Sequence, residues 1–424
     1  LTAAACTRSF NQMETHLADW IRNTPEGNEV EAVLRACVHC GFCTATCPTY
    51  QLLGDELDSP RGRIYLMKQM FEGGEVTSST REHLDRCLSC RSCESTCPSG
   101  VQYHKLLDIG RATIEKLVPR PAGERVQRSL LRTVVPNPTV FKTLLKAGEI
   151  VRPILPKAWS EKMPRRSKKA GKRPAPRHQR RMLILEGCAQ PSLSPNTNAA
   201  TARVLDRLGV SVIAAPEAGC CGAVDFHMNA QEDGLNRARN NIDAWWPMIE
   251  QGCEAIIQTA SGCGAFVKEY GYLLRNDPVY ADKAKRVSEL AKDLVEVIRK
   301  EPLETLGVLS GKKLAVHCPC TLQHAQKLGG AIEEVLKRLG FNLTAVSEGH
   351  LCCGSAGTYS LTQPEISMAL RDRKLDALER GKPESIVTAN IGCQTHLASG
   401  GKTPVQHWIE LIDEALTARF VPNH

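Results

Sequence analysis

The stretch "CVHCGFCTATCP", residues 37–48, places four cysteines at the spacing C-x2-C-x2-C-x3-C and ends on a proline. The same spacing returns at residues 87–98 as "CLSCRSCESTCP". Thiolates at this spacing are typical ligands of 4Fe-4S clusters, because soft sulfur donors suit iron in such clusters. The two runs therefore predict two adjacent clusters, which would form a path for electrons.

The fourth cysteine of such a run usually completes the neighbouring cluster. We therefore assign two crossed sets of ligands: Cys37, Cys40, Cys43 and Cys97 for the first cluster, and Cys87, Cys90, Cys93 and Cys47 for the second. Zinc and plain buried cysteine are the alternatives. Structural zinc usually takes two close pairs of ligands with a longer insert between them, which is not the pattern of this chain.

The residues around the two runs predict helices rather than strands. "RGRIYLMKQMFEGG" (residues 61–74) and "VQYHKLLDIGRATIEKLV" (residues 101–118) carry apolar side chains at helical spacing. We therefore expect an α-helical dicluster ferredoxin domain over residues 1–118. Arg61 and Arg63 follow the first run and could donate to cluster sulfur, line a docking face, or simply belong to a solvated helix start.

Length and composition fit a globular protein of several domains, with 424 residues, 42% apolar and 24% charged. We expect neither a signal peptide nor a membrane-spanning run, and we expect the chain in the cytoplasm. In a reducing compartment, the 19 cysteines are better explained as metal ligands than as a disulfide scaffold.

The positive charge is concentrated in one segment. The whole chain carries +8, and Lys157–Arg181 alone carries eleven Lys or Arg against one acid, so the remainder is close to neutral. Because this segment contains three prolines, we expect residues 119–181 to be a helical connection followed by an exposed basic linker. The linker could contact an anionic membrane surface or an acidic partner, or be solvated only. No nucleic-acid-binding motif accompanies it, so we expect no nucleic-acid partner.

The second half of the chain repeats a cysteine pattern. Four positions recur at offsets of 130, 132, 132 and 130 residues: Cys188, Cys220, Cys221 and Cys263 correspond to Cys318, Cys352, Cys353 and Cys393. We expect two Cys-Cys-Gly repeats, at residues 182–310 and 311–424. Strands alternate with helices in each, which predicts an α/β fold with mainly parallel sheets. The cysteines follow the carboxyl ends of strands and should converge at one rim.

These eight thiols are candidates for a further iron-sulfur cluster or for zinc, although free cysteine is often only a small buried apolar residue. Cys320, in "HCPCTLQH", lies close to Cys318 and could substitute for it as a ligand. Gly222 and Gly354, directly after the paired cysteines, allow a tight turn there.

Paired ferredoxin runs followed by two Cys-Cys-Gly repeats resemble the iron-sulfur subunits grouped with heterodisulfide reductases, anaerobic glycerol-3-phosphate dehydrogenases and lactate-utilisation proteins. The stretches "LRACVHCGFCTATCPTYQLLGDELDSPRGRIYL", "LEGCAQPSLSPNTNAATARVLDRLG", "ARNNIDAWWP", "TASGCGAFVKEYG" and "HCPCTLQHAQKLGG" are most similar to the iron-sulfur subunits of bacterial glycolate oxidases. The resemblance extends from about residue 31 to the end and weakens in the basic linker.

This resemblance implies a three-subunit complex, peripheral on the inner face of the cytoplasmic membrane. Two FAD-type partner subunits would oxidise glycolate, with D-lactate as a further candidate substrate, to the 2-oxo acid. The chain would be the non-flavin electron-transfer subunit, passing electrons towards a quinone-type acceptor. No G-x-G-x-x-G follows a strand, so we expect no FAD in this chain and no catalytic residue for the substrate.

The chain departs from the wider group at the end of each repeat. Heterodisulfide reductases have C-x-x-C there and use it to help hold a catalytic cluster, whereas this chain has "CGAF" and "CQTH". Phe266 and His396 thus replace the last cysteine, and His396 is either a metal ligand or a hydrogen-bonded core histidine. A thiol/disulfide oxidoreductase that uses a cluster in the repeats is the alternative function, and a docking platform with a structural metal is a third.

Overall fold

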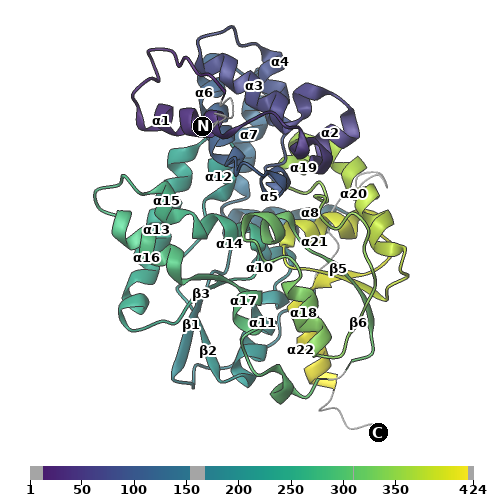
Figure 1. Ribbon diagram of the computed structural model, residues 1–424. Coiled ribbons are helices and arrows are strands. Elements are labelled where there is room, and N and C mark those ends of the chain that lie inside the picture. Colours follow the sequence, from purple (N-terminus) through teal and green to yellow (C-terminus); the bar gives the residue numbers. More distant parts are fainter. Residues whose placement is uncertain (1–12, 153–167, 309, 419–424) are drawn as a thin grey trace, which may run out of the picture. The chain divides into compact units, whose positions relative to one another are not determined.

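The computed structural model describes residues 13–152, 168–308 and 310–418 and divides the chain into two compact units, residues 1–121 and 122–424 (Figure 1). The first part of the predicted basic linker, residues 157–167, lies outside the described residues. Residues 168–179 form neither helix nor strand. No described helix is both long enough and apolar enough to cross a bilayer.

The first unit is helical throughout its described part. Its elements are α1 (Pro25–Ala36), η1 (Phe42–Thr46), α2 (Pro48–Leu53), η2 (Glu56–Asp58), α3 (Pro60–Phe71), α4 (Ser78–Asp85), α5 (Ser92–Thr96) and α6 (Tyr103–Leu117). The predicted helices at residues 61–74 and 101–118 are α3 and α6, so the prediction of a helical domain is confirmed. Ser59 caps α3 by accepting a hydrogen bond from the Gly62 N–H (3.0 Å). Buried apolar residues of α1, α3 and α6 form its core.

The second unit begins with two helices, α7 (Ala122–Val134) and α8 (Pro138–Val151), which correspond to the predicted helical connection. The Arg132 guanidinium of α7 forms an ion pair with Asp225 (3.3 Å), so these helices pack with the repeats. The first repeat contains β1 (Arg180–Ile184), α10 (Gln190–Leu193), α11 (Asn196–Arg207), β2 (Val210–Ala214), α12 (Ala223–His227), α13 (Gln231–Glu250), β3 (Ile256–Gln258), α14 (Ser261–Lys268), α15 (Tyr270–Leu273), α16 (Ala281–Leu290), β4 (Ala291–Asp293), α17 (Leu294–Ile298) and η4 (Leu303–Leu306).

The second repeat has the same order of strands. Its elements are β5 (Lys313–His317), η5 (Thr321–Ala325), α18 (Ala331–Arg338), β6 (Asn342–Leu343), α19 (Tyr359–Thr362), α20 (Pro364–Glu379), β7 (Ser385–Thr388), α21 (Ile391–Gly400), β8 (Val405–His407) and α22 (Trp408–Ala418). The two sheets have the orders β2-β1-β3-β4 and β6-β5-β7-β8, and every pairing is parallel. The predicted α/β class with parallel sheets is confirmed.

The two repeats pack against each other through equivalent helices. Helix α11 contacts α22, and α17 contacts α18, which is the same pairing with the repeats exchanged. A single apolar core contains residues of both sheets, and the His407 Nε2–H donates to the Thr259 carbonyl across the contact (2.8 Å). The two sheets are thus joined through one apolar core.

A glycine fixes the turn after each Cys-Cys pair. Gly222 has φ of +98° and Gly354 has φ of +88°, which is the left-handed region that side chains disfavour. A Cβ at these positions would lie 2.4 Å from the carbonyl oxygens of Gly234 and Ser367, respectively. Both repeats thus use the same close backbone approach to set the direction of the paired thiols.

Gly354→Ala should therefore destabilise the second unit by about 2–5 kcal/mol, because left-handed strain and overpacking add. Gly357→Ala is the matched control: its φ is +65° and no heavy atom lies within 4 Å of the added Cβ, so only the strain of about 1–2 kcal/mol should appear. Urea unfolding followed by circular dichroism measures both variants. Equal losses of stability in the two variants would show that the close contact between the added Cβ and the Ser367 carbonyl does not contribute to destabilisation.

Candidate metal centres

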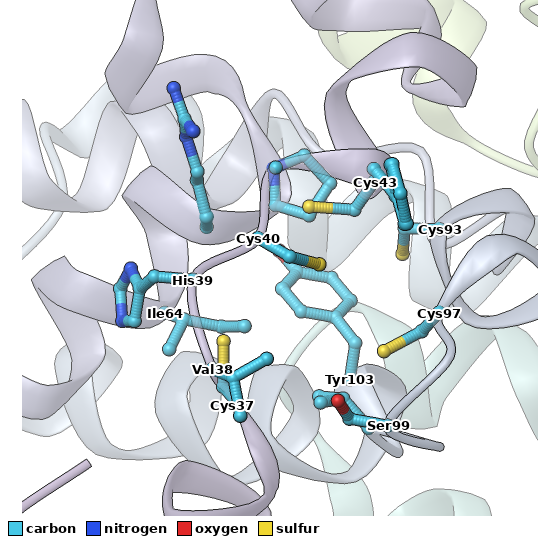
Figure 2. A pocket seen from close by; sticks show the side chains of 15 residues that line it. Cys37, Val38, His39, Cys40, Cys43, Ile64, Cys93, Cys97, Ser99 and Tyr103 are labelled. Carbon is cyan, nitrogen blue, oxygen red and sulfur yellow. The ribbon is translucent and has the colours of Figure 1, made fainter. Parts of the chain in front are cut away.

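Four thiols of the first predicted set line one cavity. Figure 2 shows the Cys37, Cys40, Cys43 and Cys97 sulfurs turned towards a common space between the first run and the end of α5. His39, Arg61 and Tyr103 also line this cavity, and Cys93 forms part of its wall. Three of the thiols come from one run and the fourth from the other, as the crossed assignment requires.

A second cavity is lined by the other predicted set, Cys47, Cys87, Cys90 and Cys93. The crossing follows from two short helices that pack together: η1 ends just before Cys47, and α5 ends just before Cys97. The Thr96 hydroxyl donates to Thr46 Oγ1 (3.2 Å) and joins their ends. The cysteine that directly follows each short helix thus lies in the cavity of the other run.

The loops between the cysteines share an unusual backbone shape. His39 and Gly41 in the first run, and Ser89 and Arg91 in the second, have φ between +51° and +85°. Alternation of right- and left-handed residues turns successive N–H groups into a concavity that favours anions, as at many iron-sulfur sites. The Ser89 N–H donates to Cys87 Sγ (3.4 Å). Donor set and backbone both fit a 4Fe-4S cluster, whose thiolate ligands are anionic.

Burial makes the thiols of these cavities harder to deprotonate. It raises the pKa of Cys43 to about 11 and raises the pKa of Cys93 well above its ordinary value. Iron binding must therefore displace protons from these thiols, so cluster assembly should be favoured at alkaline pH.

The two arginines that follow the first run have different surroundings. Arg61 lines the first cavity and is paired with Glu56 near the surface (2.5 Å). Arg63 lines the second cavity and is fully buried, so a solvated helix start does not describe it. Its guanidinium contacts the Asp58 carboxylate (3.0 Å) and donates to Thr49 Oγ1 (3.1 Å).

Sequence reasoning missed Tyr103, which lines both cavities. Its hydroxyl is buried and has no hydrogen-bond partner among the described residues, and burial raises its pKa well above the ordinary value, so the hydroxyl keeps its proton. Tyr103 is the first residue of α6 and looks like an ordinary core aromatic in the sequence. No local pattern could have separated it from the other apolar residues of this helix.

Tyr103→Phe should lower the reduction potential of the second cluster by about 40 mV, because we expect the unpartnered Tyr103 hydroxyl to donate a hydrogen bond worth about 1 kcal/mol to a ligand sulfur when the cluster is bound. An EPR-monitored redox titration measures the potential. Tyr65→Phe, on the exposed face of α3, should leave it unchanged. An unchanged potential in Tyr103→Phe would mean that the hydroxyl makes no bond to the cluster ligands.

In the first repeat the four predicted thiols come together beyond the strand ends. Hydrogen bonds link Cys188 to Cys220, Cys220 to Cys221, and Cys221 to Cys263. Cys220 accepts from both neighbours, which lowers its pKa well below the ordinary value. Arg237 lies close enough to favour the thiolate further. The set has the donors for a cluster or for a thiolate metal site.

The second repeat brings together a different set from the one expected. Cys320 Sγ lies 3.8 Å from Cys352 Sγ, in the place that Cys188 takes beside Cys220. Cys318 instead packs against the apolar core. Cys320, the expected substitute for Cys318, stands 132 residues after Cys188, which is the offset of the paired cysteines and favours it over Cys318. Cys353 forms hydrogen bonds with Cys352 and Cys393.

The two residues that replace the last cysteine are both held by the core. Phe266 is buried with its ring 5.3 Å from that of Phe226. His396 Nε2 contacts Ser367, at 3.1 Å from Oγ and 3.2 Å from the carbonyl oxygen. A buried histidine that the sequence reasoning missed, His317, lies instead among the thiols with Cys353 and Cys393. Burial lowers its pKa to about 3, so its ring is neutral.

Comparison with known protein families finds one match in the first unit and two in the second. Residues 33–101 match the family model of the 4Fe-4S dicluster domain. Residues 182–268 and 314–398 each match the model of the cysteine-rich domain. Each matched segment of the second half includes three of the four strands of one parallel sheet, and β4 and β8 lie beyond the matched residues.

Two relatives match nearly the whole chain and a third matches about half of it. The chain is 68% identical over 404 residues to the glycolate oxidase iron-sulfur subunit of Escherichia coli, covering 95% of this chain and 99% of the relative. It is 31% identical over 427 residues to the probable glycolate oxidase iron-sulfur subunit of Bacillus subtilis, covering 91% and 94%. Lactate utilization protein A of Bacillus subtilis is 27% identical over 220 residues, which covers 51% of this chain and 88% of that protein.

A solved structure shares the fold. A hypothetical protein from Helicobacter pylori aligns with a TM-score of 0.53 and 10% identity, over 92% of this chain and 72% of its own. At this identity the likeness concerns the arrangement of elements only.

Proposed function

Because this chain belongs to the family of glycolate oxidase iron-sulfur subunits, we propose that it takes electrons from a flavin partner that oxidises glycolate and passes them towards a quinone-type acceptor. D-lactate is the second candidate substrate. Oxidation of a 2-hydroxy acid to the 2-oxo acid releases two electrons and two protons, which FAD in a partner subunit can accept together. This chain then has only to transfer the electrons onward.

The observation that carries the proposal is the pair of four-thiol cavities with a shared wall. Cys93 and Tyr103 line both cavities. When bound there, two 4Fe-4S clusters supply two one-electron carriers in sequence. The residues proposed as ligands are Cys37, Cys40, Cys43 and Cys97 for one cavity, and Cys87, Cys90, Cys93 and Cys47 for the other.

The surroundings of the cavities suit this role. The helical core of the first unit buries most of the ligand cysteines, which limits solvent access. The concave N–H groups of the loops and the guanidiniums of Arg61 and Arg63 favour the added negative charge of a reduced cluster. The residues thus stabilise the reduced state without taking part in proton transfer.

The partners follow from the same proposal. We place the chain in a complex with two FAD-type glycolate oxidase subunits, peripheral on the inner face of the cytoplasmic membrane. The basic segment between Lys157 and Arg181 supports this location, because clustered Lys and Arg attract anionic lipid headgroups. Part of that segment, residues 157–167, lies outside the described residues.

The complex purified with and without this chain tests the proposal. With glycolate as the donor, we expect the flavin subunits alone to reduce an artificial dye but not a soluble quinone analogue, and we expect this chain to restore quinone reduction. Equal quinone reduction in its absence would refute the electron-transfer role. Disulfide reduction by the isolated chain with a chemical reductant would instead favour the thiol/disulfide oxidoreductase.

A further inference from the structure

Three ligand atoms meet in the second repeat at the spacing of a single metal ion. A ring nitrogen of His317 and the sulfurs of Cys353 and Cys393 all lie within 4.8 Å of one another, and all three residues are buried. We propose that they bind one divalent ion of the zinc type, separate from the two clusters of the first unit. The inference does not depend on the substrate of the complex.

The distances favour one ion over a cluster. Zinc lies about 2.3 Å from sulfur and about 2.1 Å from nitrogen, so the ligand atoms around one tetrahedral ion are less than about 4 Å apart. Three atoms within 4.8 Å need little movement to reach this geometry. Two thiolates and a neutral imidazole also balance the charge of a divalent ion, which removes the cost of burying it.

His317 is oriented as a ligand. It is the last residue of β5, and its Nδ1 lies 2.9 Å from Thr388 Oγ1 at the end of β7. Its Nε2 is buried and has no hydrogen-bond partner among the described residues. With the Nδ1–H bound to Thr388, the lone pair of Nε2 is free to bind metal, which is the usual arrangement of a metal-bound histidine.

The two thiols also have supporting donors. The Asn390 side-chain amide donates to Cys393 Sγ (3.4 Å), and the Ser355 N–H donates to Cys353. Donors of this kind stabilise thiolates and fix ligand directions. Three protein ligands leave one coordination position, which in zinc sites is taken by water or a substrate atom.

The first repeat has no counterpart of this site within its described residues. The residue 132 positions before His317 is Leu185, which is buried and carries no ligand atom. No three ligand atoms of the first repeat lie within 4.8 Å of one another where the structure describes it. The duplicated domains have therefore diverged, and the single-ion site belongs to the second repeat.

Metal analysis of the full chain tests this proposal. Protein produced with added zinc and purified anaerobically without chelators should carry about one zinc per chain in addition to the cluster iron. His317→Ala and Cys393→Ala should each lose at least about nine-tenths of that zinc. Thr388→Val keeps all three ligands and removes the support of His317, so it should weaken zinc binding about 10–100-fold.

Two matched controls separate this site from its neighbours. His396→Gln and Cys318→Ala alter a histidine and a cysteine of the same repeat that lie outside the three-ligand set, and both should keep the zinc. The EPR signals of the first unit and the circular dichroism spectrum should be unchanged in all five variants. Zinc retained by His317→Ala would overturn the proposal, as would loss of iron together with an equal amount of sulfide, since that would indicate a cluster.

Discussion

Cys47→Ala should remove the second cluster and leave the first in place, although Cys47 belongs to the first cysteine run. The reason is geometric: Cys47 lines the cavity of Cys87, Cys90 and Cys93, because η1 delivers it there. Iron should fall by about four atoms per chain, the content of one 4Fe-4S cluster. Glycolate-dependent quinone reduction should fall to background, because the electron path would be interrupted.

Reference variants identify which cluster is lost. Cys40→Ala and Cys90→Ala each remove a central ligand of one run, and their EPR spectra define the two clusters. Cys47→Ala should give the spectrum of Cys90→Ala, and Cys97→Ala should give that of Cys40→Ala. Cys253→Ser, which changes a lone buried thiol of the first repeat, should keep all the iron. A Cys47→Ala spectrum like that of Cys40→Ala would show that the ligands are not crossed.

Asp58→Ala should destabilise the first unit by about 3–5 kcal/mol, because it leaves buried positive charge without a partner. The Asp58 carboxylate is fully buried and contacts Arg63 (3.0 Å), Arg86 (3.0 Å) and His83 (3.1 Å). Arg63 also lines the second cavity, so we expect the second cluster to be lost at a lower urea concentration than in the unchanged chain.

Glu56→Ala is the control for Asp58→Ala, since both residues lie in η2 and each pairs with an arginine. Glu56 and Arg61 are partly solvated, and loss of such a pair costs only about 0–1 kcal/mol. Anaerobic urea unfolding, followed by cluster absorbance and circular dichroism, compares the two variants. Similar losses would mean that burial of the Asp58 network does not matter for stability.

The sequence was enough to predict the class of the first unit and the kind of group that it holds, because cysteines at this spacing are typical of 4Fe-4S sites. The fourth cysteine of each run enters the cavity of the other run because the short helices η1 and α5 end just before Cys47 and Cys97. The helices at residues 61–74 and 101–118 were predictable because their apolar residues recur at helical spacing and Gly73 and Gly74 end the first of them. The ligand assignment itself stays a prediction.

The side chains that complete the sites were harder to predict, because their positions depend on tertiary packing. Cys318 and Cys320 are two positions apart in the sequence. The backbone turn at Pro319, which leads into η5, determines that Cys320 is the one close to Cys352. His317 ends an apolar strand and looks like a core residue until β7 places Thr388 beside it. Arg61 and Arg63 look equivalent in the sequence, yet only Arg63 is fully buried.

Reduction by substrate tests the central claim most directly. The complex of this chain with its two flavin subunits would be mixed anaerobically with glycolate, without quinone, and frozen for EPR within the time of one turnover. In the unchanged complex we predict the EPR signals of two reduced 4Fe-4S clusters. In the Cys47→Ala complex we predict the signal of the first cluster alone. Flavin reduced by glycolate while the clusters stay oxidised would contradict the account.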